Sequence, residues 1–439
     1  MAHPRRFAGR FDRRELLRHA GLAGVAVWTT AKSWGGEPPK SPNEKLNLAG
    51  IGVGGQGGWD IGECASENIV ALCDVDDRRA AGSYNRFPKA KRFRDFRKML
   101  EAMDREIDAV VIGTPDHTHA PPAVMAMKMG KHCYCEKPLA HCVHEVRTMI
   151  EVAKKHKLAT QMGTQIHAGS NYRRVVELVQ SGAIGPVGEV HVWHPVAYGG
   201  GDRPKETPPV PPELDWDLWL GPAPWRPYHP VYVPGAWRSW WDFGTGGLGD
   251  FGCHYMDLPF WALKLRHPTT VEPVEGPPIH PERTSPGLVI RYEFPARGDL
   301  PPVTMTWYDG GKRPRFLAER KVPDWGAAVL FIGQKGMLLA DYGRRQLLPE
   351  AQFAGFQPPP KTIPDSIGHH AEWIRACKTG EPTTCNFDYS GTLAETVLLG
   401  TVAHRVGKKL AWDAENLKAV GCPEADRFIR KAYREGWRL

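Results

Sequence analysis

A glycine-rich loop and an acidic residue beyond it have the spacing of a phosphate- and ribose-binding site. Gly52, Gly54 and Gly57 fit G-x-G-x-x-G, and Asp74 follows 17 residues after Gly57. In this pattern the first glycine permits a tight turn, the second lets the backbone approach a pyrophosphate, and the third lets a helix pack close to a strand. The helix N-terminus offers free N–H groups to the phosphates, and the acid accepts hydrogen bonds from ribose hydroxyls.

The sequence therefore predicts a nicotinamide dinucleotide in this loop, which also contains Gly55 and Gln56. Asp74 favours NAD, because a carboxylate repels the 2′-phosphate of NADP. Arg78 and Arg79 lie just beyond and could instead pair with such a phosphate, so NADP remains an alternative.

Three further residues could move a proton at a reacting hydroxyl. A hydroxyl that loses a hydride must also lose its proton, so a base must lie within hydrogen-bond reach. His254 is the natural acceptor because an imidazole titrates near neutrality. Asp250 is spaced i, i+4 from it, on one face if this segment is helical. The ammonium of Lys137 can hydrogen-bond the reacting oxygen, and burial can lower its pKa enough for proton transfer.

The elements around these residues indicate a parallel sheet. Apolar strands are predicted at residues 46–51, 69–73, 107–112, 132–136 and 159–162, with helices between them. Strands that alternate with helices are typical of a doubly wound sheet, whose ligands bind beyond the carboxyl ends of the strands. Thr114, Pro115, Glu136 and Lys137 all fall at such ends.

Four sequence blocks together resemble the Gfo/Idh/MocA family, named for glucose–fructose oxidoreductase, inositol dehydrogenase and a rhizopine-catabolism protein. The blocks are residues 52–57, 114–119, 136–138 and 244–254. The resemblance runs from about residue 44 to the C-terminus. It implies that Lys137, Asp250 and His254 form the catalytic centre, and that the substrate resembles a carbohydrate.

The resemblance also implies the domain organisation. A Rossmann domain over residues 44–163 is expected to precede an α+β domain over residues 164–439 with an open, mostly antiparallel sheet. Helices predicted at 370–378 and 391–406 are expected to pack back on the first domain. Such sheets commonly mediate oligomers, so a homodimer or homotetramer is expected.

Histidines and aromatic residues supply the other candidate contacts. His117 and His119 are interpreted as cofactor contacts; they and the pair His141 and His144 lack a convincing third ligand, so no metal is expected. Seven tryptophans lie between residues 193 and 241, and most should pack in the core. Tryptophans can also stack on sugar rings. The predicted substrate contacts are His167, Trp237, Arg238 and Trp240.

Residues 1–43 are predicted to be an export signal and linker. Arg13 and Arg14 lie in a segment that resembles a twin-arginine motif, and the apolar stretch at residues 20–28 is too short to span a bilayer. This predicts a periplasmic protein exported already folded. Residues 1–40 hold eight Lys or Arg and three Asp or Glu, so the formal net charge of +8 lies mostly there and indicates no nucleic-acid partner.

The sequence favours an oxidoreductase that acts on a secondary hydroxyl of a sugar, glycoside or cyclic polyol. One alternative is a redox-neutral enzyme with tightly bound NAD, either a glycoside hydrolase or a sugar–sugar oxidoreductase. Export favours that alternative, because free NAD is not expected to be recycled outside the cytoplasm. The other alternative is a non-catalytic sugar or dinucleotide sensor.

Overall fold

The computed structural model describes residues 44–199 and 201–439. The predicted export signal and linker, residues 1–43, lie outside this part of the chain. In the described residues, no helix combines the length and apolar character needed to cross a membrane.

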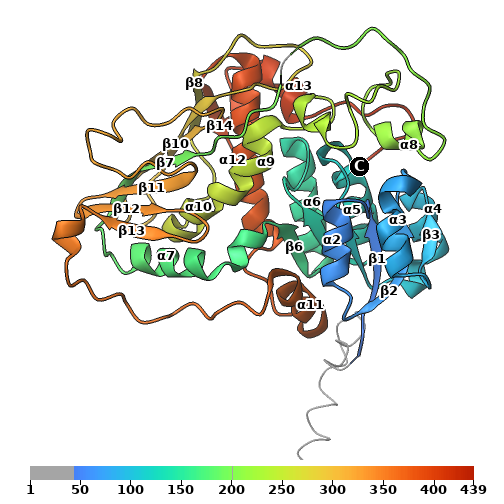
Figure 1. Ribbon diagram of the computed structural model, residues 1–439, viewed down its shortest axis with the longest axis horizontal. Helices are drawn as coiled ribbons and strands as arrows, with labels where there is room; N and C mark the ends of the chain where they lie inside the picture. Colours follow the sequence, from blue (N-terminus) through green and yellow to red (C-terminus); the bar gives the residue numbers. More distant parts are fainter. Residues whose placement is uncertain (1–43, 200) are drawn as a thin grey trace, which may run out of the picture. The chain divides into compact units, whose positions relative to one another are not determined.

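The first domain contains a six-stranded parallel sheet in the order β3-β2-β1-β4-β5-β6 (Figure 1). Its strands are β1 (Asn47–Ile51), β2 (Asn68–Cys73), β3 (Lys91–Phe93), β4 (Ala109–Ile112), β5 (His132–Glu136) and β6 (Thr160–Gly163). The order reverses direction between β1 and β4, and the crevice at such a switch point is where these sheets bind ligands.

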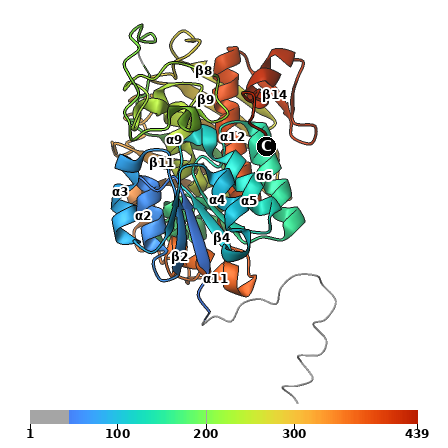
Figure 2. The ribbon, with the colours of Figure 1, turned by 90° about the vertical axis from the view of Figure 1, so that its right-hand side faces the viewer.

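Helices cover both faces of this sheet. They are α2 (Gln56–Glu63), α3 (Asp77–Arg86), α4 (Phe96–Ala102), α5 (Ala120–Lys128), α6 (Val143–His156) and, from the C-terminal part, α11 (His369–Thr379). Figure 2 shows α2 and α3 on one face and α4, α5 and α6 on the other. Buried on both sides, the strands are nearly continuous apolar runs, as in the sequence Ala109–Ile112.

The second domain contains a nine-stranded sheet in the order β13-β12-β11-β7-β10-β9-β8-β14-β15. Only β7 and β10 pair in parallel; the other neighbours are antiparallel. Its strands are β7 (Val187–Trp193), β8 (Thr270–Glu275), β9 (Val289–Phe294), β10 (Val303–Tyr308), β11 (Ala328–Gly333), β12 (Gly336–Ala340), β13 (Arg345–Leu348), β14 (Leu410–Asp413) and β15 (Lys418–Val420).

One face of this sheet is apolar and lies in the core with the surrounding helices. These helices are α7 (Ser170–Gln180), α9 (Gly246–Tyr255), α10 (Asp257–Leu263) and α12 (Phe387–Val406). The opposite face presents polar side chains such as His191, Arg291 and Thr304, and next to them a smaller apolar cluster that includes Trp193, Leu330 and Leu339. This alternation is typical of an antiparallel sheet with one face on the core.

Helix α12 connects the two domains. It packs against α6 of the first domain and against α9 and β8 of the second, and Figure 1 shows α9 and α12 between the two sheets. Two glycines allow this close approach: a Cβ at Gly391 would lie 2.6 Å from the side chain of Ile150, and one at Gly400 only 2.1 Å from the hydroxyl of Tyr292. The predicted fold class, a Rossmann domain followed by an α+β domain with a mostly antiparallel sheet, is confirmed.

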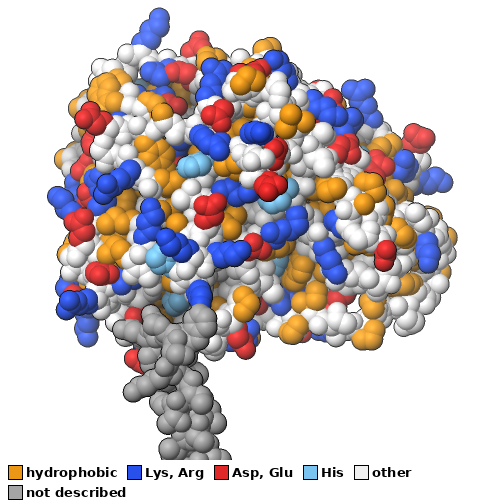
Figure 3. Space-filling model, turned by 180° about the vertical axis from the view of Figure 1, so that it is seen from behind, with side chains coloured by type: hydrophobic (Ala, Val, Ile, Leu, Met, Phe, Trp, Pro, Cys, Tyr) orange, Lys and Arg blue, Asp and Glu red, His pale blue; other side chains and the backbone are white. Residues whose placement is uncertain are grey.

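The remaining α-helices are short: α8 (Trp216–Leu220) and α13 (Asp426–Ile429). Around α8 the predicted tryptophan-rich segment forms a small core of its own, in which Trp216 and Trp219 stack with ring centroids 4.8 Å apart. On the face shown in Figure 3, Lys and Arg side chains lie among Asp and Glu side chains.

Candidate active site

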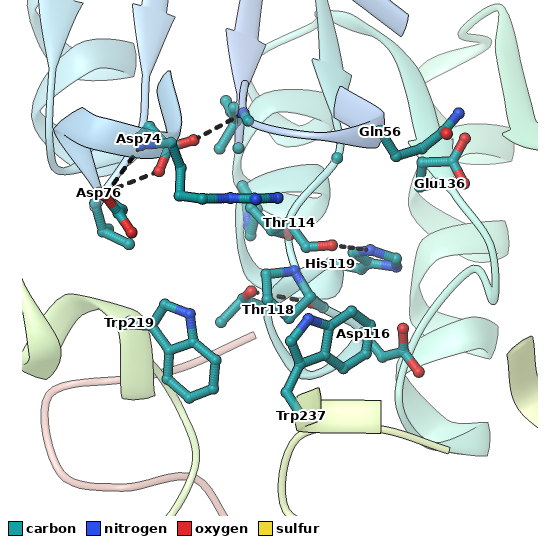
Figure 4. A pocket seen from close by; sticks show the side chains of 18 of the residues that line it. Gln56, Asp74, Asp76, Thr114, Asp116, Thr118, His119, Glu136, Trp219 and Trp237 are labelled. Atoms are coloured by element: carbon teal, nitrogen blue, oxygen red, sulfur yellow. Dashed lines mark hydrogen bonds between the residues drawn. The ribbon is translucent and has the colours of Figure 1, made fainter. Parts of the chain in front are cut away.

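A pocket of about 500 Å³ opens at the carboxyl ends of β1, β2, β4 and β5 (Figure 4). It has the position and size expected of a cofactor and substrate site. The predicted site residues that line it are Gly52, Gly54, Gln56, Asp74, Thr114, Pro115, His119, Glu136, Lys137, Trp237, Arg238 and His254. In Figure 4 the pocket extends from Asp74 and Asp76 at one end to Glu136 and Asp116 at the other.

The glycine-rich loop has the geometry that a pyrophosphate cradle requires. A Cβ at Gly57 would lie 1.9 Å from the carbonyl oxygen of Gly52, so only glycine lets α2 approach β1 this closely. Gly52 and Gly55 have φ of 74° and 57°, a conformation that glycine adopts without strain. No side chain caps the N-terminus of α2, which leaves its N–H groups for phosphate oxygens. These residues therefore fit a dinucleotide.

Asp74 lies at the end of β2 and fixes the conformation of this loop. Its Oδ2 accepts hydrogen bonds from the backbone N–H groups of Val53 (2.8 Å) and Gly54 (3.1 Å), and its Oδ1 accepts one from Asp76 (2.9 Å). Burial raises the pKa of this carboxyl to about 6, although the three N–H donors oppose the shift. A carboxylate has about four acceptor positions, so Asp74 keeps room for a ribose hydroxyl.

Lys137 and Asp250 form a buried ion pair between the two domains. The ammonium of Lys137, at the end of β5, donates to the carboxylate and to the backbone carbonyl of Asp250 on α9, the latter at 3.0 Å. Two other groups hold the same carboxylate: the hydroxyl of Tyr198 donates to it at 2.7 Å, and the guanidinium of Arg238 lies 3.3 Å away.

This pair changes the role expected of Lys137. Burial alone lowers the pKa of the lysine, as predicted, but the carboxylates of Asp250 and Glu136 more than offset it and the net shift is upward. The prediction that burial makes Lys137 a proton-transfer group is therefore wrong in this structure. Lys137 is a permanent hydrogen-bond donor. For Asp250, burial by itself raises the pKa, but the cations of Lys137 and Arg238 reverse this shift and keep the carboxylate ionised.

His254 lies one helical turn beyond Asp250 on α9 and also lines the pocket. Burial and the nearby ammonium of Lys137 lower its pKa to about 3. The prediction that it titrates near neutrality is thus wrong for this structure, because the interior disfavours an imidazolium beside a second cation. His254 is therefore neutral at physiological pH, which leaves one ring nitrogen unprotonated. Its buried Nδ1 has no hydrogen-bond partner among the described residues.

Two acids in the pocket titrate near neutrality. Burial raises the pKa of Asp116, which accepts a 2.7 Å hydrogen bond from the hydroxyl of Thr245, to about 7. Burial also raises the pKa of Glu136, which accepts a 2.6 Å hydrogen bond from the amide of Gln165, to about 8. Sequence reasoning missed Asp116, although it lies inside the block of residues 114–119 that it used.

Three predicted contacts do not reach the pocket. His117 is fully buried, and its Nε2 lies 3.0 Å from the backbone carbonyl of Trp219. His167 pairs with the buried carboxylate of Asp257 at 2.9 Å. Trp240 is fully buried in the small tryptophan-rich core. All three side chains are packed in the protein interior, and their positions in the sequence could not show that they are buried there. Gly55 and Gly57 shape the loop without lining the pocket.

Sequence reasoning also missed residues that lie far apart along the chain. Trp219 lies across the pocket from the strand ends (Figure 4), and Trp437 from the C-terminal tail lines it too. The guanidinium of Arg97 lies 4.5 Å from the ring centroid of Trp437. Tyr198 follows no motif, so only the fold shows that it reaches Asp250. Within residues 44–199 and 201–439, no cluster of three or more His, Cys, Asp or Glu could hold a metal ion.

The Rossmann domain has an uncapped helix N-terminus at the pocket, and the α+β domain contributes Arg238 and His254 to it. Together these features are typical of dinucleotide-binding oxidoreductases. Two family models match the chain. Residues 46–164 match "Oxidoreductase family, NAD-binding Rossmann fold" and residues 168–297 match "Oxidoreductase family, C-terminal alpha/beta domain". The chain belongs to the Gfo/Idh/MocA oxidoreductase family, as the sequence blocks predicted.

Individual relatives match only part of the chain. An inositol 2-dehydrogenase from Rubrobacter xylanophilus is 32% identical over 160 residues, 35% of this chain and 45% of the relative. An alpha-N-acetylgalactosaminidase from Shewanella oneidensis is 27% identical over 283 residues, 56% of this chain and 55% of the relative. The chain thus spans about half the length of these curated relatives.

Solved structures share the fold over most of the chain. The WlbA dehydrogenase from Bordetella pertussis, solved in complex with NADH and UDP-GlcNAcA, has a TM-score of 0.60 and 16% identity. The likeness covers 85% of this chain and all of that one. At this identity the match shows the fold alone.

Proposed function

We propose that this protein transfers a hydride between a tightly bound nicotinamide dinucleotide and a secondary hydroxyl of a sugar, glycoside or cyclic polyol. The observation that carries the proposal is that Lys137 and His254 line the pocket together, while Asp250, which does not line it, pairs with Lys137. Family membership and the inositol 2-dehydrogenase relative support a polyol-like substrate. The acid at Asp74 favours NAD over NADP.

The charge states of the site assign a role to each residue. The ammonium of Lys137 donates a hydrogen bond to the reacting oxygen and stabilises the negative charge that develops there. Neutral His254 accepts the hydroxyl proton. The carboxylate of Asp250 keeps Lys137 protonated and orients it, and Arg238 and Trp237 are placed to bind the substrate. When bound, the dinucleotide supplies the hydride acceptor.

A redox-neutral reaction is the second candidate. The alpha-N-acetylgalactosaminidase relative matches more than half of this chain, and its alignment is longer than that of the inositol dehydrogenase. In such a reaction the sugar would be oxidised only transiently and the hydride returned after a bond is broken. The twin-arginine-like leader favours this cycle, since an exported protein would benefit from a resident cofactor loaded before export. We also propose a periplasmic location and a homo-oligomer.

One experiment separates these candidates. The protein is purified without added cofactor, the dinucleotide that copurifies is identified by mass spectrometry, and sugars, glycosides and cyclic polyols are offered with and without external NAD. Accumulation of NADH with turnover would support the dehydrogenase, whereas product without net NADH would support the redox-neutral cycle. In either case His254→Ala is expected to lower kcat at least ~100-fold, the lower range for general acid–base catalysis. Unchanged activity in His254→Ala would overturn the assignment of the base.

A further inference from the structure

A second cavity of about 530 Å³ lies apart from the dinucleotide pocket and shares none of its lining residues. It is enclosed by the loops at residues 222–224 and 279–281, by the end of α12 and by α13 with the residues after it. Its size is that of a small-molecule site.

Two of the four Lys, Arg and Asp side chains that line this cavity already have partners. The ammonium of Lys431 lies 2.8 Å from the carboxylate of Glu145. The carboxylate of Asp242 pairs with the guanidinium of Arg226. These two pairs leave no net charge at the cavity.

Arg405 and Arg427 are the other two charged side chains that line the cavity. Across the described residues, neither guanidinium takes part in a hydrogen bond or an ion pair. Both lie against the ring of Phe428, with Arg405 4.0 Å and Arg427 4.6 Å from its centroid. The charge of Arg427 acts on Arg405, whose pKa it helps to lower. Arg405 also lies 5.0 Å from the ring of Trp241.

The environment of Arg405 makes its lack of a counter-ion costly. Burial lowers the pKa of its guanidinium to about 10, a shift that the nearby carboxylate of Asp242 opposes without reversing. Largely buried charges in proteins are normally paired, because removing an unpaired charge from water is unfavourable. The cavity in front of Arg405 is where a counter-ion from outside the chain would bind.

We propose that this cavity binds a small phosphate monoester with an apolar or ring-bearing body. A phosphate monoester carries about −1.5 to −2 charges near pH 7, which matches two unpaired guanidinium groups better than a carboxylate does. The planar fork of arginine suits phosphate oxygens. Pro222, Pro224, Pro281 and the ring of Trp241 supply apolar walls for the body of the ligand.

The cavity also contacts the back of the active-site loops. His141, which lines it four residues after Lys137, lies with its Nε2 3.3 Å from the backbone carbonyl of Gly244, just before α9. Lys431 donates to the backbone carbonyl of His117 at 3.2 Å. A ligand in the second cavity would therefore contact His141 and Lys431, which hydrogen-bond to the loops beside Lys137 and α9. It would not enter the dinucleotide pocket.

Phenyl phosphate is a probe with both required features, and its binding can be measured by calorimetry on the full chain saturated with NAD. NAD fills the phosphate-binding loop of the first pocket, so a second phosphate site is observed by itself. We expect saturable binding of one equivalent that weakens as salt is raised. Arg405→Gln is expected to weaken binding at least 10-fold, and Arg427→Gln less, because Arg427 is exposed.

Arg320→Gln is the matched control, because Arg320 is exposed, lies 4.4 Å from the ring centroid of Phe316 and does not line the cavity. It should bind phenyl phosphate as the unsubstituted protein does. If Arg405→Gln does not fold, Arg405→Lys keeps the charge but loses the fork and should still weaken binding. Absence of saturable binding, equal affinity in the Arg405 variant, or equally tight binding of benzoate would overturn the proposal.

Discussion

At the scale of single residues, the charge state of each group follows from its neighbours rather than from its type. Lys137 and His254 are both buried in the same site. Burial disfavours the charged form of both groups. For the lysine the neighbouring carboxylates outweigh burial and it stays charged, whereas for the histidine the ammonium of Lys137 acts in the same direction as burial and it stays neutral. This division suits a donor to the reacting oxygen and an acceptor of its proton.

Removing the carboxylate of Asp250 should therefore lower the pKa of Lys137, so that its loss of a proton affects the activity. In Asp250→Asn, burial is no longer offset by that carboxylate, so the pKa of Lys137 should fall. The expected result is a kcat reduced at least ~100-fold and lost further as pH rises. The measurement is the pH profile of kcat.

The matched control for this prediction is Asp309→Asn. Asp309 is a buried carboxyl of the second domain that does not line the pocket. Its substitution should leave the shape of the profile unchanged. A profile for Asp250→Asn parallel to that of the unsubstituted protein would show that Asp250 does not control Lys137.

Asp116 should give the active site a titration near neutrality. Its pKa of about 7 means that it ionises as pH rises through that value, adding a negative charge close to Lys137 and Arg238. The negative charge of Asp116 stabilises the positive charge that His254 gains when it takes the hydroxyl proton. The kcat/KM for oxidation should therefore rise through about pH 7. In Asp116→Asn the inflection should disappear while NAD binding persists. An inflection that survives this substitution would assign it to another group.

At the scale of elements, the turn from β1 to α2 is the part of the site most constrained by geometry. Gly57→Ala would place a Cβ 1.9 Å from the carbonyl oxygen of Gly52. Such overpacking typically costs about 1–3 kcal/mol, and it would also separate the helix N-terminus from the phosphates. We expect a lower unfolding free energy and a Kd for NAD at least ~10-fold higher, measured by denaturant unfolding and calorimetry.

Gly82→Ala is the control for this prediction. Gly82 lies inside α3, where a Cβ would meet no atom within 4 Å. Replacing a helical glycine by alanine is expected to stabilise the protein by about 0.5–1 kcal/mol without changing NAD binding. Equal effects of the two substitutions would mean that the loop is not the tight cradle described above.

Some elements of the fold could be predicted from the sequence and others could not. The strands of the first sheet could be, because each is a buried apolar run next to a helix, and β5 has the predicted bounds of residues 132–136. The site residues supplied by short motifs next to these strands, such as Asp74 and Lys137, were found for the same reason. Tyr198 and Trp437 could not be found, since long-range packing alone brings them to the site.

At the scale of the whole molecule, buried acids should make stability depend on pH. The carboxyls whose pKa burial raises to about 7 or 8 are Asp60, Asp116, Asp309 and Glu136. Each binds its proton more tightly when folded, so its contribution is complete below its unfolded pKa and is lost as pH rises through its folded pKa. Asp250 shifts the other way, so its contribution is lost only in acid.

Buried histidines such as His254 have lowered pKa values and act in the opposite sense below about pH 6.5. The free energy of unfolding should therefore fall between about pH 6.5 and pH 8. Denaturant unfolding at a series of pH values measures this slope, and Asp309→Asn should reduce it. A free energy that rises steadily over this range would contradict the raised pKa values.

The central claim is that a hydride leaves a carbon of a carbohydrate-like substrate in the pocket formed by Asp74, Lys137 and His254. The direct test is a single turnover of the NAD-saturated protein with sugars and cyclic polyols deuterated at their hydroxyl-bearing carbons, quenched in acid. Mass spectrometry of the dinucleotide should reveal deuterium on the nicotinamide for at least one substrate, and far less with His254→Ala. A substrate that is turned over with no deuterium ever reaching the nicotinamide would contradict the account.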